Sequence, residues 1–492
     1  MKNIKLISLL LAMILFLSSC GIIIINNEDA IETVPPVTTE TPPETYIPPE
    51  YPIVADDRKE KAKVRLDALP EADLDGLGMI IAAENESGSF FSDETGIYVD
   101  AVKYRNSLVS DKYNTSIVTL YKNATQIHTD IRNSKTSGHY FADFTVVAAN
   151  ILGAYNSAGF IVSLQALPYT DFSVDCYNQQ AMGQLSVGNV IYGAVGALTE
   201  TPEQLGCFYI NKTALSTLGA ELDYRRIYDG EFTWDMLFEY QALADGDIKQ
   251  FATSSDNGTV GLYSFMGAGR TFLTSEDGAL TPTFINDVTR TVIRNAKQLN
   301  LVRTNTVNTV VTETDEEGNT VEKTVKLSGF SVFAGGYALT AQGTLGDMSY
   351  LKNAGFDFEV LPFPKLEGQE EYYSSTPVTA PVVTFLATSP NIDAGGYVLQ
   401  ALSEVSYGYV QNEFTVNAMK TVTTGVYTPD MIDLILENPV YDFCYMFGNS
   451  HAGLKNGTYT VLVNAIGSAK DISSFYTNKI KNELSKVLAA YN

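Results

Sequence analysis

Residues 78–89 read GMIIAAENESGS, a short apolar run that ends abruptly in polar residues. A continuous apolar run of this length fits a strand that is buried on both faces of a parallel sheet. The segments SIVTLY (116–121) and FADFTVVAA (141–149) also fit strands, and residues 100–113 fit a helix. Strands that alternate with helices predict an α/β architecture built in layers.

Three later segments predict further elements. Thr233 is the expected N-cap of a helix that begins TWDMLFEYQALA, because its hydroxyl oxygen can accept a hydrogen bond from the first turn. Residues 305–327 alternate Val and Thr with polar residues on both sides of Glu-Gly-Asn, which predicts a hairpin at the surface. A helix is predicted near the C-terminal end, with an apolar stripe formed by Ile480, Leu484, Val487 and Leu488.

The composition is that of a globular chain with an acidic surface. Of the 492 residues, 45% are hydrophobic and 18% are charged, which provides enough apolar material for a sizeable core. Without a leader and a linker about 430 residues remain, which suggests two or three domain-sized units. The formal net charge of −25 would repel phosphate backbones, which argues against nucleic acid as a partner.

The N-terminal residues predict export. Residues 6–25 read LISLLLAMILFLSSCGIIII, and Lys2 and Lys5 precede this apolar run. Small residues just before Cys20 suit a signal peptidase, and the pattern Leu-Ser-Ser-Cys-Gly resembles a bacterial lipobox, whose cysteine receives a diacylglyceryl group. We therefore expect a lipoprotein signal peptide at 1–19 and a lipid anchor, with acyl chains such as palmitate, on Cys20.

An uncleaved N-terminal helix is the alternative, since about 20 apolar residues suffice to cross a bilayer. Either arrangement places the rest of the chain outside the cytoplasm. Residues 20–58 are rich in Pro, Thr and Glu, with too few apolar groups to offset the entropy of ordering. We expect this segment to be a lipid-anchored linker that holds a folded body away from the extracellular face of the cell membrane.

The cysteines do not indicate a disulfide framework. The chain contains Cys20, Cys176, Cys207 and Cys444. With Cys20 lipidated, the other three cannot all pair, and no C-x-x-C spacing indicates a metal or redox site. We expect these three to be small buried hydrophobic residues, although partial pairing among them stays open.

No motif predicts an enzyme, a metal site or a cofactor. The chain has only three histidines, His128, His139 and His451, and none has metal-ligand spacing. The sequence GNSHA (448–452) resembles a nucleophile elbow, but Ala452 stands where the last glycine is needed. Glu84 with Glu86 is weak support for a glycosidase pair in so acidic a chain. A hydrolase that uses one of these groups is therefore a minor alternative.

Several stretches, in this order, resemble the family 1 extracellular solute-binding proteins of ABC importers, the maltodextrin-binding-protein-like group of bacterial lipoproteins. The lipobox comes first. GMIIAAENESG resembles the first strand and ligand-facing loop of the group, and FYINKTALSTLGAE followed by FTWDML resembles a frequent block. The other similar stretches are ADFTVVAANILGAYNSAGFIVSL (142–164), FAGGYALTAQGTLGD (333–347) and FDFEVLPFPKLEG (356–368). The resemblance covers nearly all of residues 60–492.

The resemblance implies an α/β, two-lobed periplasmic-binding-protein-like fold, each lobe a mostly parallel sheet flanked by helices, with a hinge between them. The first lobe would comprise residues 60–192 plus 366–405, and the second 199–360 plus 410–492, with the hairpin at 305–327 as an insertion. Ligand would lie in the cleft, outside the carboxyl ends of the strands. Closure about the hinge would then trap it.

The chemistry of a sugar site selects candidate residues on loops at strand ends. Carboxylate and amide groups can bond neighbouring hydroxyls, and aromatic rings can cover the C–H face of a sugar. The candidates are Glu84, Asn85, Asn150, Tyr192, Tyr263, Arg270, Gln342 and Asp347. By the resemblance, Asn150 takes the place of a sugar-binding carboxylate, and Tyr263 and Arg270 lie in the glycine-rich loop of the second lobe.

Each candidate also has a structural alternative. Glu84, Asn85 and Asn150 can be helix caps, the tyrosines can belong to the core or the rim, and Arg270 can pair with a surface acid. Where maltodextrin-binding relatives carry a stacking tryptophan, this chain has Leu345, and the only tryptophan, Trp234, is expected to be a packing residue. A small sugar, or a ligand held by tyrosines, fits this departure better than a long oligosaccharide.

The resemblance implies a monomeric binding protein without enzymatic activity that captures a small solute, a carbohydrate, and delivers it to the permease subunits of an ABC importer. The alternative is a surface lipoprotein of the same fold that acts as a sensor partner or adhesin without transport.

Overall fold

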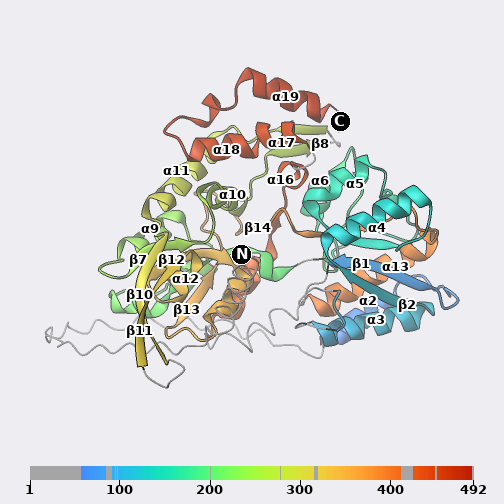
Figure 1. Ribbon diagram of the computed structural model, residues 1–492, viewed down its shortest axis with the longest axis horizontal. Coiled ribbons are helices and arrows are strands. Elements are labelled where there is room, and N and C mark those ends of the chain that lie inside the picture. Colours follow the sequence, from blue (N-terminus) through green and yellow to red (C-terminus); the bar gives the residue numbers. More distant parts are fainter. Residues whose placement is uncertain are drawn as a thin grey trace, which may run out of the picture.

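Figure 1 shows two α/β lobes side by side, with connecting segments between them. The computed structural model describes residues 57–84, 91–94, 96, 98–199, 201–276, 279–314, 320–411, 425–448 and 451–489. The leader with Cys20 and most of the linker lie outside these residues.

The first lobe is built on a four-stranded sheet in the order β15-β3-β1-β2. Its strands are β1 (Gly78–Glu84), β2 (Ser116–Lys122), β3 (Phe144–Ala148) and β15 (Pro381–Phe385). β1 is parallel to both β2 and β3, and β15 is antiparallel to β3. The three predicted strands are confirmed, although only β1 and β3 are largely buried, because β2 lies at the edge of the sheet.

Helices flank this sheet. They are α2 (Asp57–Asp67), α3 (Val99–Tyr113), α4 (Ala124–Ser137), η1 (Ala149–Ile151), α5 (Leu152–Ser157), η2 (Leu164–Ala166), α6 (Gln179–Leu185), α13 (Ile392–Val405) and the π-helical turn η5 (Ser406–Val410). Residues 100–113, predicted as a helix, form nearly all of α3.

The second lobe is built on a sheet in the order β13-β6-β12-β7. Its strands are β6 (Gly206–Asn211), β7 (Lys249–Thr253), β12 (Ala338–Thr344) and β13 (Phe358–Leu361). β7, β12 and β13 run in one direction and β6 is antiparallel to both β12 and β13, so each sheet is mostly parallel with one opposed strand. The chain reaches β6 from the first lobe, and Gly206, where β6 starts, pairs with Thr344, where β12 ends.

The helices of the second lobe come from two separate stretches of the chain. The first stretch supplies η3 (Pro202–Gln204), α7 (Lys212–Thr217), α8 (Tyr224–Tyr228), α9 (Trp234–Ala242), α10 (Asn257–Gly267), α11 (Asp287–Val302), α12 (Phe330–Ala334) and η4 (Leu345–Leu351). The second supplies α15 (Thr428–Glu437), α16 (Phe443–Phe447), α17 (Ala452–Gly457), α18 (Tyr459–Ile466), η6 (Ile472–Ser474) and α19 (Asn478–Leu488).

Helix caps explain where several of these helices begin. The predicted N-cap is confirmed, because the Thr233 hydroxyl accepts a hydrogen bond from the Met236 N–H at the start of α9. On α19, Leu484 and Leu488 are buried, and Ile480 and Val487 pack against the same cluster, which confirms the predicted stripe.

Helix α10 corrects the prediction that Tyr263 lies in a glycine-rich loop. Asp256 caps this helix by accepting a hydrogen bond from the Thr259 N–H, and Tyr263 lies within it. The glycines serve close packing instead of a loop: a Cβ on Gly261 would lie 1.9 Å from the side chain of Ile466. Glycine content alone therefore gave the wrong structure for this segment.

Short two-stranded pairs complete the fold. A hairpin pairs β10 (Thr306–Thr314) antiparallel with β11 (Thr320–Ser328), and a second pairs β8 (Leu273–Glu276) with β9 (Ala279–Pro282). The remaining pairs are β4 (Ser186–Val187) with β5 (Val190–Ile191), and β14 (Ser374–Ser375) with β16 (Pro439–Val440).

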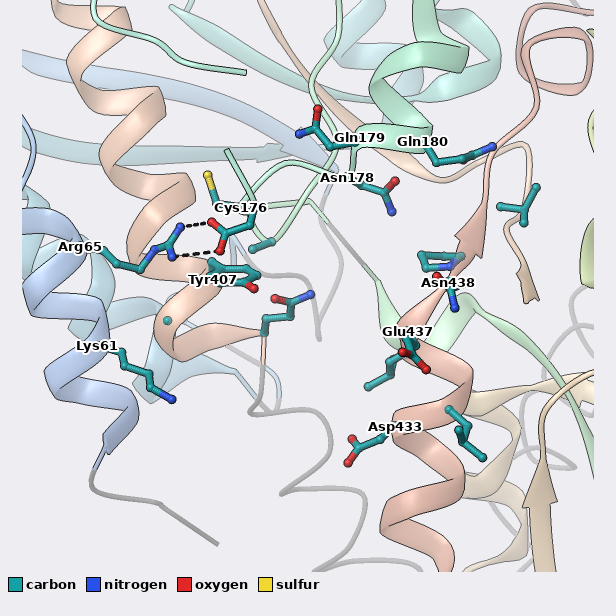
Figure 2. A pocket seen from close by; sticks show the side chains of 18 of the residues that line it. Lys61, Arg65, Cys176, Asn178, Gln179, Gln180, Tyr407, Asp433, Glu437 and Asn438 are labelled. Atoms are coloured by element: carbon teal, nitrogen blue, oxygen red, sulfur yellow. Dashed lines mark hydrogen bonds and ion pairs between the residues drawn. The ribbon is translucent and has the colours of Figure 1, made fainter. Parts of the chain in front are cut away.

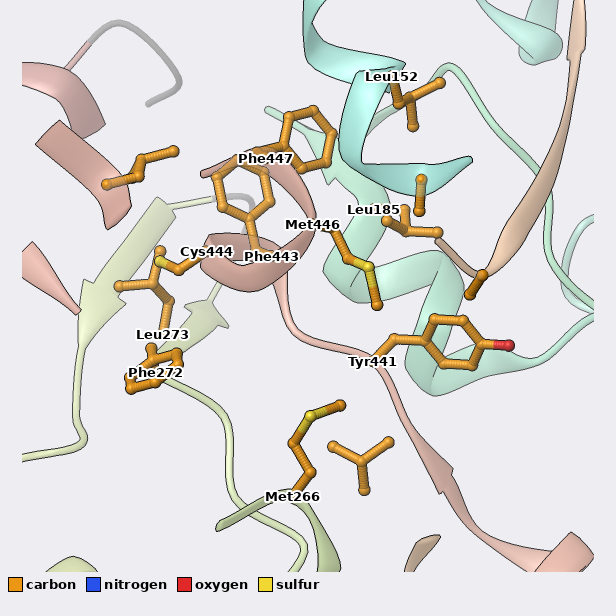
Figure 3. Packing of buried hydrophobic residues seen from close by; sticks show 14 of the residues in the cluster. Leu152, Leu185, Met266, Phe272, Leu273, Tyr441, Phe443, Cys444, Met446 and Phe447 are labelled. Atoms are coloured by element: carbon orange, nitrogen blue, oxygen red, sulfur yellow. The ribbon is translucent and has the colours of Figure 1, made fainter. Parts of the chain in front are cut away.

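A shared apolar core joins the lobes, and α16 lies at its centre. Figure 3 shows Phe443, Met446 and Phe447 of α16 between Leu152 and Leu185 of the first lobe and, on the other side, Phe272 and Leu273 of the second lobe. All seven side chains are 5% exposed or less. Separating the lobes along either face of α16 would therefore expose apolar surface to water.

Two further sequence predictions concern burial and membrane spans. Cys176, Cys207 and Cys444 are all buried with free thiols, and burial raises the pKa of each. Among the described residues, no helix combines the length and apolarity needed to cross a bilayer.

Candidate functional site

The two lobes meet at Val378, on the segment between β14 and β15. The backbone N–H of Asn150 donates to the Val378 carbonyl oxygen over 3.0 Å. Asn150 follows directly after β3, so this contact marks the carboxyl end of that strand. From the other side, Tyr445 on α16 lies beside the Val378 backbone, and both residues line the same small cavity. A single residue thus connects the predicted loop of the first lobe with a tyrosine that comes from the C-terminal part of the chain.

Three tyrosines of the second lobe lie close together at this point. Burial is the main cause that raises the pKa of Tyr445, and the neighbouring hydroxyls of Tyr263 and Tyr459 add to it. The pKa of Tyr263 is also raised by burial, with a further contribution from the charge of Asp347. Asp256 contributes in the same way to Tyr459. These hydroxyls therefore stay protonated at neutral pH and can both donate and accept hydrogen bonds.

A cavity of about 200 Å³ opens beside these tyrosines. It is lined by Val378, Cys444, Tyr445, Gly448, Lys455 and Tyr459. Its volume falls below the 300 to 1,000 Å³ of a common drug-sized ligand pocket, so it suits a small guest. Two aromatic rings, a lysine ammonium group and backbone groups offer both a stacking surface and polar contacts.

The wall from the first lobe carries Glu84 at the carboxyl end of β1. Burial raises the pKa of Tyr155 to about 12, and the charge of Glu84 contributes, so the two side chains are neighbours. His128 stacks on Tyr155 with ring centroids 5.6 Å apart. The first lobe therefore places a carboxylate near the buried ring of Tyr155, against which the exposed His128 ring stacks.

The structure divides the predicted candidates into two groups. Asn150 contacts Val378, Tyr263 neighbours Tyr445, and Asp347 lies near Tyr263. Glu84 lies near Tyr155 in the first lobe. Asn150 is not a helix cap, because α5 begins after Ile151 without a side-chain cap. Asp347 does act as a cap, since its carboxylate accepts a hydrogen bond from the Thr344 N–H at 2.7 Å at the start of η4.

The other described candidates are Gln342, Tyr192 and Arg270. Gln342 is only 1% exposed, and it pairs with Phe208 across the second sheet, where the Phe208 ring packs edge-on against Trp234. Tyr192 packs against the shared core, and Arg270 is exposed just beyond α10. Asn85, Glu86 and Ser450 of the GNSHA motif lie outside the described residues, as does Cys20.

Two substitutions noted in the sequence have a clear structural setting. Leu345, in the place of a stacking tryptophan, is 1% exposed and belongs to the core of the second lobe. Trp234 is 4% exposed, which confirms its prediction as a packing residue. Neither residue offers an open aromatic platform to a ligand.

Sequence reasoning missed the residues that line the small cavity. Tyr445, Lys455 and Tyr459 flank the GNSHA motif and belong to no motif themselves. The density of aromatic residues between 441 and 459 was the available signal, because tyrosine combines a stacking face with a polar tip.

A much larger cavity, of about 1230 Å³, lies between α2 of the first lobe and α15 of the second lobe (Figure 2). Lys61 and Arg65 of α2 form one wall, and Asp433 and Glu437 of α15 form the opposite one. Arg65 is held by Asp175 and by Glu404, the latter through an Nε–Oε2 hydrogen bond of 2.6 Å. None of the predicted candidates that the structure describes lines this cavity.

Within the described residues, no three His, Cys, Asp or Glu side chains are grouped as ligands for a metal ion. The arrangement at Val378 combines hydroxyls, an ammonium group and aromatic rings. It can exchange the hydration of a small polar molecule for protein hydrogen bonds.

Comparison with solved structures identifies the fold. A cyclo/maltodextrin-binding protein complexed with maltotetraose matches with a TM-score of 0.54 and 12% identity over 84% of this chain and 96% of that one. A cyclic alpha-maltosyl-1,6-maltose binding protein from Arthrobacter globiformis matches with a TM-score of 0.54 and 12% identity, over 84% of this chain and 100% of that one. The chain has the periplasmic-binding-protein-like fold. A family 1 extracellular solute-binding protein from Bifidobacterium longum subsp. infantis is also similar, with a TM-score of 0.50 and 13% identity, over 84% of this chain and 99% of that one.

These proteins of the periplasmic-binding-protein-like fold are binding proteins, and the first is in complex with maltotetraose, an oligosaccharide. At 12 to 13% identity the likeness shows the fold alone. No protein-family model matches the chain, and no curated protein matches it in sequence.

Proposed function

We propose that this chain is the substrate-binding lipoprotein of an ABC importer and that it captures a small extracellular carbohydrate between its lobes. The observation that carries the proposal is the group at Val378, where Asn150 and Tyr445 meet beside a polar cavity at the carboxyl end of β3. Ligands of open α/β sheets bind at this end of the strands. The chain would deliver its ligand to permease subunits and break no bond.

The size of the ligand follows from what fills the cleft. Helix α16 packs between the lobes with Phe443, Met446 and Phe447, and the cavity beside Tyr445 and Tyr459 measures about 200 Å³. Leu345 is buried and extends no stacking surface. A sugar of one or two units fits these boundaries, whereas a long oligosaccharide would need a longer aromatic platform.

The attachment and the moving units are part of the same proposal. Lipid on Cys20 would hold the body at the outer face of the membrane, because two acyl chains anchor stably where one is marginal. Residues 60–192 with 366–405, and 199–360 with 410–492, would form the two lobes that hinge about the ligand. Mass spectrometry of the mature N-terminus tests the anchor independently of the ligand.

A thermal-shift screen of mono- and oligosaccharides tests the binding function. A ligand present at 100 times its dissociation constant stabilises the folded state by about 2.7 kcal/mol, which raises the melting temperature measurably. We expect small sugars to give the shift and Tyr459→Ala to remove it. Tyr350→Ala is the matched control, because Tyr350 is 72% exposed and lies outside the site.

If no sugar shifts the melting temperature while peptides or polyamines do, the carbohydrate part of the proposal would be overturned. Hydrolysis of a sugar that binds would overturn the non-enzymatic part. A shift that Tyr350→Ala removes as fully as Tyr459→Ala would show that the cavity is not the site.

A further inference from the structure

The second lobe carries a basic groove on an otherwise acidic protein. The groove lies between α11 and residues 469–472, and it encloses about 630 Å³. Arg290, Arg294, Lys297 and Lys470 line it, whereas Asp471 is the only acid among its described lining residues. With 57 acids against 32 basic residues in the whole chain, such a concentration of positive charge needs an explanation.

Asp471, the acid that lines the groove, already accepts hydrogen bonds from neighbouring residues. The Nε of Arg290 donates to the Asp471 carboxylate over 2.8 Å, and its Nη1 donates to Asp287 over 2.8 Å. Asp471 also accepts hydrogen bonds from the backbone and hydroxyl of Ser473. These donors hold the pKa of the Asp471 carboxyl well below its usual range. Asp471 therefore orders Arg290 and neutralises it.

The remaining cations are available to a partner. Arg294 makes only a 3.4 Å contact with the Thr291 hydroxyl, and no described acid forms an ion pair with Lys297 or Lys470. Arg294 and Lys470 are exposed, and Lys297 is half-buried. A guanidinium group beside ammonium groups suits carboxylates, which accept the planar fork of arginine in a bidentate manner.

An apolar residue extends the same face of the helix. Residues 290, 294, 297 and 301 follow the helical repeat and so share one face of α11. Leu301 is 86% exposed, the largest value among the exposed large hydrophobic side chains of the described residues. A polyanion without apolar groups would gain nothing from Leu301, whereas a protein segment could bury it.

We propose that this basic groove docks an acidic protein segment that ends in an apolar residue. The carboxylates would pair with Arg294, Lys297 and Lys470, and the apolar residue would cover Leu301. In Figure 1, α11 lies on the side of the second lobe that is turned away from the first lobe. A partner bound there would leave the cleft between the lobes accessible.

Direct binding of a defined peptide to the mature chain tests the proposal. The probe is a fluorescent peptide that alternates glutamate and serine and ends in phenylalanine, so that its carboxylates recur about every 6.6 Å when extended. We expect saturable binding that weakens as salt is raised, because exposed charge pairs are screened. Arg294→Glu with Lys297→Glu should weaken binding about tenfold or more.

A matched control exists in the first lobe. Arg132 and Lys135 of α4 have the same spacing and are both exposed, so Arg132→Glu with Lys135→Glu changes the net charge equally. This control should keep the wild-type affinity. Leu301→Ser should weaken the binding of the peptide that ends in phenylalanine several-fold. The binding of a peptide that ends in serine should stay unchanged.

Three outcomes would overturn the proposal: no binding of the probe at low salt, equal losses in the two double variants, or polyphosphate binding as tightly as the peptide with no effect of Leu301→Ser. The last outcome would identify the groove as a general polyanion site. Circular dichroism of each variant confirms that the fold is retained.

Discussion

Glu203 is a titratable residue at the contact between the lobes. Its carboxylate accepts a hydrogen bond of 3.3 Å from the hydroxyl of Tyr98, which precedes α3 in the first lobe. Burial raises the pKa of Glu203 from 4.5 to about 7, and this effect exceeds the opposing hydrogen bond from Tyr98. The protonated carboxyl therefore favours the folded state, and its contribution is complete below pH 4.5 and lost as the pH rises through about 7.

We predict that Glu203→Gln reduces the pH dependence of stability. Between pH 5 and pH 8 the free energy of unfolding of the wild-type chain should fall by about 1 to 2 kcal/mol more than that of the variant. This figure allows for partial solvent exposure of Glu203. Urea unfolding at the two pH values measures the difference. Glu239→Gln, at an exposed position of α9, should behave as the wild type, and identical pH profiles for all three proteins would contradict the prediction.

At the same scale, single residues show what sequence could and could not predict. Thr233 was predictable as a cap because its partner lies three residues away. Tyr445 was not, because its contact with Val378 joins positions that are distant in the chain and share no periodic pattern. For Gln342 the strand position was predictable, but the burial of its side chain, which is 1% exposed, was not, because the sequence does not say which face of the sheet it occupies.

At the scale of elements, α6 holds the segment that precedes α16. The Gln180 side chain donates to the Tyr441 carbonyl and accepts from the Tyr441 N–H, both at 2.8 Å. Gln184 accepts from the Phe443 N–H at 3.0 Å. These three hydrogen bonds link the first lobe to the chain that enters α16, and the shared apolar core reinforces them.

We predict that Gln180→Ala with Gln184→Ala loosens the two lobes. The loss of the three bonds should lower the free energy of unfolding by about 2 to 3 kcal/mol and increase the radius of gyration measured by small-angle X-ray scattering. Gln165→Ala is the matched control, because Gln165 also bonds backbone groups, at Asn189 and Ile191, but within the first lobe. An equal change in the control would contradict the role assigned to α6.

At the scale of the whole molecule, the fold was predictable and the closeness of the lobes was not. Apolar runs followed by polar loops identified β1 and β3. Several stretches that resemble family 1 solute-binding proteins in the same order indicated two lobes. The antiparallel β6 follows from the path of the chain between lobes, which no local pattern encodes. The place of α16 follows from burial of Phe443 and Phe447 against both lobes, which is a property of the assembled core.

The most direct test of the central claim is calorimetric titration with a series of sugars of one to four units, chosen from the type that responds in the thermal-shift screen. A cleft closed around a cavity of about 200 Å³ predicts that affinity reaches its maximum at one or two units and does not rise further. Affinity that grows steadily up to the tetrasaccharide would contradict the account, because it would require an extended binding surface that the small cavity beside Tyr445 and Tyr459 does not offer.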